Sequence, residues 1–129
     1  MTTTNKPTKA ELEILSILWE RNPASVRDVY ARLSELKPVK YTSVLKTMQI
    51  MFEKGMLKRD ATAKAHLYRP VQTQRQTQKN LVNDLLDRAF RGSALKLVQH
   101  VLETKPASHD ELAEIKRMIS EVEAKGDRK

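Results

Sequence analysis

Four short motifs divide this chain into helices before any longer pattern is considered. Each is a Ser or Thr followed three residues later by an acid or amide side chain, which lets both side chains satisfy backbone amides where a helix begins. The motifs begin at Thr8, Ser25, Thr73 and Ser108. With four such starts and only three glycines in 129 residues, the chain is expected to be mainly helical.

The first two motifs predict a pair of helices near the N-terminus. Residues 8–21 carry an apolar stripe and are followed by Pro23, which ends the first helix. Residues 25–36 form the second helix, which Pro38 limits in the same way. Trp19 falls on the apolar stripe of the first helix, so core packing is favoured over an exposed stacking role.

A third helix is predicted within residues 39–55 from periodicity, because side chains sort onto two faces at about 100° per residue. The apolar side carries Tyr41, Val44, Leu45, Met48, Met51 and Phe52. The opposite side carries Thr42, Ser43, Lys46, Gln49, Ile50 and Glu53, with Thr47 at its edge. Gly55 stands where a left-handed cap would end the helix. The polar side suits either the major groove of DNA or ordinary solvent exposure.

A β-hairpin is predicted directly after this helix, with strands in residues 56–60 and 65–71 around a small polar loop. Two helices joined by a tight turn and followed by a hairpin make a winged helix-turn-helix, expected to span residues 1–71. His66 is expected to make a structural hydrogen bond. The basic side chains expected near a duplex backbone are Lys58, Arg59, Lys64 and Arg69.

The distribution of charge supports a polyanionic ligand for this N-terminal part. The net charge is +8, and residues 1–71 hold 13 Lys and Arg against 7 Asp and Glu. Residues 72–129 hold 11 against 9, so the basic excess lies mostly with the winged domain. Double-stranded DNA is the favoured ligand. A winged helix that binds protein without sequence-specific DNA binding, or one that binds structured RNA, is the alternative.

Residues 72–129 are predicted to form a helical dimerisation domain. Their helices have wide apolar faces but too few residues to enclose them in one chain, so a second copy is the expected partner. The apolar positions are Leu85, Leu86, Phe90, Leu95, Val98, Leu102, Leu112, Ile115 and Ile119. A two-fold dimer would place two recognition helices about one turn of DNA apart, or a multiple of it. Packing back onto the winged domain is the alternative.

The sequence offers no sign of catalytic, metal or membrane chemistry. Nucleophile-elbow, phosphate-loop, dinucleotide and HExxH motifs are absent, and no enzyme activity, metal or cofactor is expected. The chain has no cysteine, and its three histidines lack metal-ligand spacing. Neither a signal peptide nor an apolar run of about 18 residues is present. A cytoplasmic protein without membrane insertion is therefore expected.

Several segments, taken in order, resemble the penicillinase-repressor (BlaI/MecI/CopY) family over roughly residues 7–123. They are Leu12–Leu15, Leu18–Trp19, Ser25–Tyr30, Tyr41–Leu45, Glu53–Gly55, Tyr68–Pro70, Phe90–Ser93 and Glu111–Leu112. The resemblance implies a cytoplasmic homodimeric transcriptional repressor that binds dyad operators, often of TACA/TGTA type. It implies dimerisation through the C-terminal helices. It also implies base-reading contacts from Thr42, Ser43, Lys46 and Thr47.

The resemblance further implies how repression could be relieved. Copper-responsive relatives use C-terminal cysteines, which this chain lacks, so metal sensing of that type is not expected. In β-lactam-responsive relatives a membrane sensor protease triggers cleavage in the penultimate helix, and the matching dipeptide here is His100-Val101. Many relatives carry Arg or another polar residue at the position of Ile50. An isoleucine can contact a thymine methyl but cannot pair with guanine.

Overall fold

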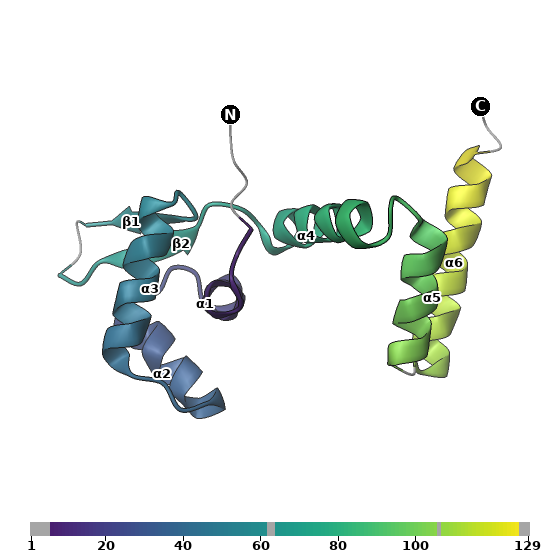
Figure 1. The fold of residues 1–129 in the computed structure, drawn as a ribbon. Coiled ribbons are helices and arrows are strands. Elements are labelled where there is room, and N and C mark those ends of the chain that lie inside the picture. The colour runs from purple at the N-terminus through teal and green to yellow at the C-terminus, as the bar shows by residue number, and fades with distance from the viewer. Residues whose placement is uncertain (1–5, 62–63, 106, 127–129) are drawn as a thin grey trace. The chain divides into compact units, whose positions relative to one another are not determined.

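The computed structural model describes residues 6–61, 64–105 and 107–126. Within these residues the chain forms six helices and one two-stranded antiparallel sheet (Figure 1), confirming the predicted mainly helical chain with a hairpin. The elements are α1 (Lys9–Glu20), α2 (Val26–Leu36), α3 (Tyr41–Glu53), β1 (Leu57–Asp60), β2 (Leu67–Pro70), α4 (Gln74–Ala89), α5 (Ala94–Thr104) and α6 (His109–Gly126). The chain separates into unit 1, residues 1–82, and unit 2, residues 83–129. The boundary falls inside α4.

All four predicted capping motifs stand where helices begin. At the start of α1 the Thr8 hydroxyl accepts the amide of Glu11 at 3.1 Å, and the Glu11 carboxylate accepts the amide of Thr8 at 2.9 Å. The same reciprocal pair of bonds joins Ser25 to Asp28 and Thr73 to Gln76. Before α6, the Ser108 hydroxyl accepts the amide of Glu111 at 3.1 Å. Local hydrogen bonding therefore sets these helix starts.

The core of unit 1 lies where its three helices and the hairpin meet. Helix α1 contacts α2, α3 and β2, and α3 contacts α2 and β1. Its fully buried side chains are Ile14, Leu18, Val29, Val44, Met48 and Met51. Leu57 of β1 and Tyr68 of β2 are also buried. Since burying each large apolar side chain stabilises a fold by about 1.5–3 kcal/mol, the inner side of α3 is firmly held.

The turn after α3 directs the chain into the hairpin. Gly55 has φ of +83°, a left-handed conformation that glycine adopts without a steric penalty. Its amide donates to the carbonyl of Phe52 at 3.1 Å, and the amide of Met56 donates to the carbonyl of Met51 at 2.9 Å. This pair of bonds is a Schellman motif, and it confirms the predicted left-handed cap.

The hairpin is shorter than predicted and is fastened at its base. Its register pairs Leu57 with Pro70, Lys58 with Arg69, Arg59 with Tyr68, and Asp60 with Leu67. Ala24, between α1 and α2, exchanges two backbone hydrogen bonds with Tyr68, at 3.1 and 2.8 Å. His66 is exposed just before β2, and among the described residues it has no hydrogen-bond partner, so the predicted structural bond was wrong. Residues 62–63 of the predicted loop lie outside the described residues.

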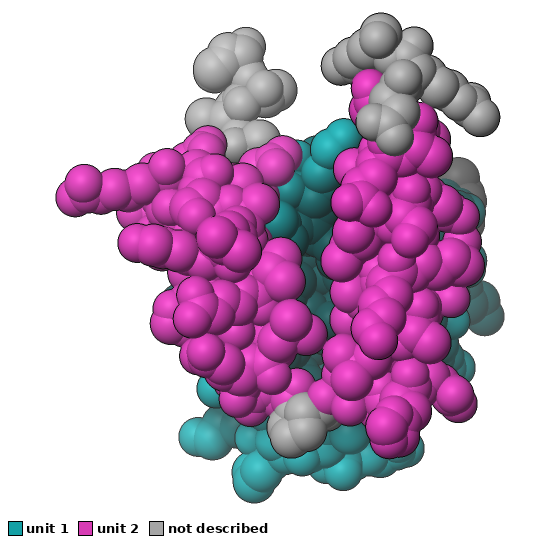
Figure 2. Space-filling view, turned by 90° about the vertical axis from the view of Figure 1, so that its right-hand side faces the viewer, with its two compact units in different colours: residues 1–82 teal, residues 83–129 magenta. Residues whose placement is uncertain are grey.

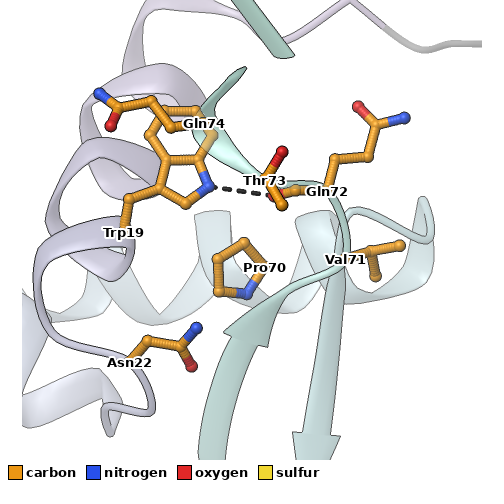
Figure 3. Close-up of a pocket in the computed structure, with 7 residues that line it drawn as sticks. All are labelled: Trp19, Asn22, Pro70, Val71, Gln72, Thr73 and Gln74. Atoms are coloured by element: carbon orange, nitrogen blue, oxygen red, sulfur yellow. Dashed lines mark hydrogen bonds between the residues drawn. The ribbon is translucent and has the colours of Figure 1, made fainter. Parts of the chain in front are cut away.

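Trp19 joins α1 to the segment that leads into α4. Its side chain is half-buried against the core, which confirms the predicted packing role. The indole N–H donates to the carbonyl of Gln72 at 3.0 Å (Figure 3). Beside this bond is a pocket of about 270 Å³ whose seven lining residues are all uncharged (Figure 3). The first turns of α4 also belong to unit 1, and Thr77 is buried there.

A carboxylate is buried at the start of α1 and is paired with the end of α3. The Glu11 side chain is 4% exposed, and Lys54 donates to it at 2.7 Å. Burial raises the pKa of Glu11, but the hydrogen bonds from Lys54 and Thr8 outweigh burial and leave the pKa below its ordinary value. The folded state therefore favours the ionised carboxylate.

Replacing Glu11 with alanine should lower the free energy of unfolding by about 1–3 kcal/mol, because a cap is lost and Lys54 loses its partner. Because the folded-state pKa is lowered, the stabilisation is present above the ordinary Glu pKa of about 4.3. It is lost as pH falls through the lower folded value. Urea unfolding at pH 7 and near pH 3 would measure both effects. Glu13→Ala is the matched control, since its ion pair with Lys37 is more exposed. Equal losses for both variants would contradict the prediction.

Unit 2 consists of the end of α4 together with α5 and α6. The rings of Phe90 and His100 lie 5.6 Å apart, and the Ser93 hydroxyl caps α5 by accepting the amide of Lys96 at 3.2 Å. Neither α5 nor α6 contains a buried residue. In the space-filling view the helices of this unit stand as two columns with an open gap between them (Figure 2). In the described ranges, no helix has the length and apolarity needed to cross a membrane.

Candidate nucleic-acid interface

The outward side of α3 is a continuous polar surface. We call it the recognition face and define it by the exposed residues of this helix: Thr42, Ser43, Lys46, Gln49, Ile50 and Glu53. Lys46 lies near its centre by helical periodicity. Ile50 is the one apolar member of the recognition face, and it is 38% exposed. Since Val44, Met48 and Met51 are fixed in the core, the recognition face is presented on a rigid support.

Thr47 is less exposed than the other three residues predicted to read bases. It is half-buried, and its hydroxyl donates to the carbonyl of Ser43 at 2.8 Å. The hydroxyl proton is therefore already used inside α3, although the oxygen can still accept a hydrogen bond. Thr42, Ser43 and Lys46 are exposed, as a base-reading role requires.

The basic side chains around α3 fall into two groups. Lys37 and Lys54 are neutralised by Glu13 and Glu11, at 2.9 and 2.7 Å. In the described parts of the chain, the members of the second group have no carboxylate partner. They are Arg27, Lys40, Lys46, Lys58, Arg59, Lys64 and Arg69. The first group stabilises the fold, and the second leaves its charge available to an external anion.

Several of these unpaired basic residues lie on the hairpin of β1 and β2, which we call the wing. Lys58 and Arg69 are cross-strand partners on the outer side of the hairpin, and like charges placed directly opposite each other are destabilising. A bound polyanion would remove that repulsion. Arg59 is on the inner side, where its guanidinium carbon lies 4.1 Å from the centre of the Phe52 ring. Lys64 is exposed next to the undescribed residues 62–63.

The start of α3 is also unusual. Its N-cap residue is Lys40, whose side chain makes no capping bond. A cation at this end of a helix is opposed by the helix dipole, and Ser, Thr, Asp or Asn would be the stabilising choice. Lys40 was missing from the predicted site. Lys58, predicted near the duplex backbone, and Gln49, predicted on the polar side of the helix, are both exposed. The pairing of Lys58 with Arg69 required the strand register.

The predicted dimerisation residues lie on surfaces that the chain leaves uncovered or only partly covered. Leu85, Leu95, Val98, Leu102 and Ile119 are exposed. The remaining four, Leu86, Phe90, Leu112 and Ile115, are half-buried. Four further apolar residues of the same region are also exposed, which are Val82, Val101, Met118 and Val122. Helical spacing places Val122 beside Ile119.

Three packed helices, a hairpin at the end of the third helix and an unpaired basic surface define a winged helix-turn-helix protein of the DNA-binding class. The sequence model of the family described as penicillinase repressor matches residues 7–121. The protein named Transcriptional regulator BlaI, in two strains of Mycobacterium tuberculosis (CDC 1551 / Oshkosh and ATCC 25618 / H37Rv), is 30% identical over 116 residues. That match covers 88% of this chain and 83% of each relative. The chain belongs to the penicillinase repressor family.

Family membership settles the broad function. This is a family of DNA-binding transcriptional regulators and not of enzymes, and the chain acts as a transcriptional repressor. The fold agrees with that assignment, since unit 1 presents a polar helix face and a basic hairpin on a well-packed core. Among the described residues no cluster of three or more potential metal ligands occurs.

Proposed function

We propose that this repressor acts as a homodimer on a dyad operator, with unit 1 reading DNA and unit 2 forming the dimer. The observation that carries the proposal is the uncovered apolar surface of α5 and α6. Leu95 is 78% exposed and Val122 is 69% exposed, and neither helix buries a single residue. Soluble monomers seldom expose apolar side chains this closely grouped. A second copy of the same surface would cover them.

In the proposed complex, α3 lies in the major groove and the wing contacts the backbone. Thr42, Ser43 and Lys46 would meet base edges, and Ile50 would contact a thymine methyl group. The unpaired lysines and arginines would neutralise phosphates and release counterions, so affinity should fall steeply with salt. Thr47 would contribute as an acceptor or through its methyl group. Arg59, Lys64 and Arg69 would place the wing on the duplex.

Two linked recognition units would bind one dyad far more tightly than one unit alone. Once the first half-site is occupied, the second contact becomes intramolecular, and the gain can reach about 10²–10⁴-fold without any new contact. Repression would follow from occupancy of the promoter, and loss of the dimer would release it.

Cleavage of α5 is a direct way to lose the dimer. His100 and Val101 are both exposed on α5, so the predicted cleavage dipeptide lies on the surface. A cut between them would remove the last four residues of α5 and all of α6, and with them most of the apolar surface of these two helices. A membrane sensor protease is the partner that family resemblance suggests for this step.

Lys46→Ala should weaken binding to the duplex upstream of the protein's own gene by about 1–3 kcal/mol, because a base contact is lost at the centre of the recognition face. Fluorescence anisotropy with the upstream duplex and a shuffled duplex of the same composition would measure the effect. Lys116→Ala, an exposed lysine of α6, is the control and should leave both affinities unchanged.

The two duplexes separate the alternatives. A loss confined to the upstream duplex supports base readout by Lys46, whereas an equal loss on both duplexes makes Lys46 a phosphate contact. Undiminished binding would remove Lys46 from the interface. If the unmodified protein binds both duplexes equally and weakly, operator recognition is wrong and a protein-binding winged helix is the better account.

A further inference from the structure

Two arginines outside the recognition face are each held over an aromatic ring of α3. Arg27, near the start of α2, has its guanidinium carbon 5.5 Å from the centre of the Tyr41 ring. Arg59, on β1, lies 4.1 Å from the centre of the Phe52 ring. The Tyr41 ring is itself braced by an edge-on contact with Tyr30 at 5.5 Å. Both guanidinium groups are therefore positioned before any ligand arrives.

The two rings are related by the helix repeat. Tyr41 is the first residue of α3 and Phe52 the twelfth. Eleven residues make slightly more than three complete turns, so both rings lie on the same flank of the helix, about 16 Å apart along its axis. The two guanidinium groups thus stand near opposite ends of the recognition face. The major groove is about 12 Å wide, so its flanking backbone lies within reach of side chains at these positions.

The donors of both arginines are unused. In the described parts of the chain neither guanidinium forms an ion pair or donates a hydrogen bond. Asp28, the neighbour of Arg27 in sequence, is held instead by the amide of Ser25 at 3.1 Å. A cation–π contact does not use the N–H groups of a guanidinium as hydrogen-bond donors to another polar group, and phosphate fits that planar set of donors.

We propose that Arg27 and Arg59 are two backbone-phosphate anchors, held ready by Tyr41 and Phe52, that fix how the recognition helix sits on DNA. The proposal rests on the DNA-binding function proposed above and adds that these two phosphate contacts are pre-ordered by aromatic rings of α3. Because phosphate contacts position a protein without reading sequence, the anchors act on any duplex. Pre-ordering by the rings reduces the side-chain entropy that each contact would otherwise lose.

The test uses the full-length protein with the upstream duplex and the shuffled duplex at several salt concentrations. Arg27→Gln and Arg59→Gln should each weaken binding to both duplexes by a similar factor, roughly tenfold. Each should also reduce the slope of log K against log salt by about 0.9, the value for one phosphate contact. A lysine at either position should restore the slope but only part of the affinity.

Variants of the rings test the pre-ordering. Phe52→Leu and Tyr41→Leu keep both charges, so the salt slope should stay near that of the unmodified protein while affinity falls several-fold. Phe52→Tyr keeps the ring and should bind like the unmodified protein. In a double-mutant cycle, Arg59→Gln should cost less affinity once Phe52 is leucine. Thermal melts of each variant identify any loss that comes from unfolding.

The matched control is Arg32→Gln, which changes an arginine of the same helix as Arg27. Arg32 already pairs with Glu35 at 3.1 Å, so its removal should leave the slope unchanged. If Arg27→Gln has the same slope of log K against log salt as Arg32→Gln, then Arg27 is not a phosphate anchor. The same comparison decides the role of Arg59. Failure of the unmodified protein to prefer the upstream duplex would refute operator recognition instead, while the anchors would remain measurable on both duplexes.

Discussion

Replacing Ile119 with aspartate should convert the protein to monomers and weaken its binding to a dyad duplex by about 10²–10⁴-fold. Ile119 lies on the apolar side of α6 and is 52% exposed within one chain. A charge there costs the protomer little, but in a dimer it would be buried without a partner. Sedimentation equilibrium would measure whether the variant is a monomer or a dimer. Fluorescence anisotropy with duplexes that carry one or two half-sites would measure how much affinity the second half-site adds.

Ser120→Asp is the control for this experiment. It introduces the same charge one residue away at an exposed position, turned from the apolar stripe by the 100° step of the helix. It should leave the dimer intact. A chain that ends at His100 should behave like Ile119→Asp, since it lacks the same surface. If Ile119→Asp still sediments as a dimer, α6 does not form the dimer surface.

Met48→Ala should lower the free energy of unfolding by about 2–5 kcal/mol, because the side chain is completely buried and its removal leaves a cavity. For a domain of this size each kcal/mol corresponds to roughly 4–8 °C in melting temperature. The chain has a single tryptophan, and Trp19 belongs to unit 1, so its fluorescence reports unfolding of that unit.

The effect should extend to DNA binding, since Met48 anchors the inner side of the helix that carries the recognition face. Gln49→Ala alters the next, exposed residue and should change stability by no more than about 0.5 kcal/mol. Met48→Leu keeps most of the volume and should recover most of the stability. A melting temperature for Met48→Ala within two or three degrees of the unmodified protein would contradict the prediction.

The helices could be predicted because their signals are local. Thr8 and Glu11 satisfy each other's amides within a single turn, and Gly55 ends α3 through its own backbone conformation. The two faces of α3 were predicted correctly for the same reason. Periodicity alone places Met48 on the buried face and Lys46 on the exposed face. Interactions of this kind depend on only a few neighbouring residues.

The contacts that complete the site depend on segments far apart in the chain. Two examples are the backbone pairing of Ala24 with Tyr68 and the hydrogen bond from Trp19 to Gln72. No local sequence pattern predicts either contact. The position of Arg59 over Phe52 required both the hairpin register and its docking on α3. The hydroxyl of Thr47 donates to a carbonyl of its own helix. Periodicity assigns a residue to a face of a helix but does not show whether its hydroxyl is already hydrogen-bonded.

The uncovered faces of α5 and α6 have a consequence for gene dosage. If an operator accepts only paired chains, its occupancy at low abundance rises with the square of the protomer concentration. Halving the amount of repressor would then reduce occupancy nearly fourfold, and doubling it would have the opposite effect. A promoter that controls its own repressor through such a site would switch over a narrow range of expression.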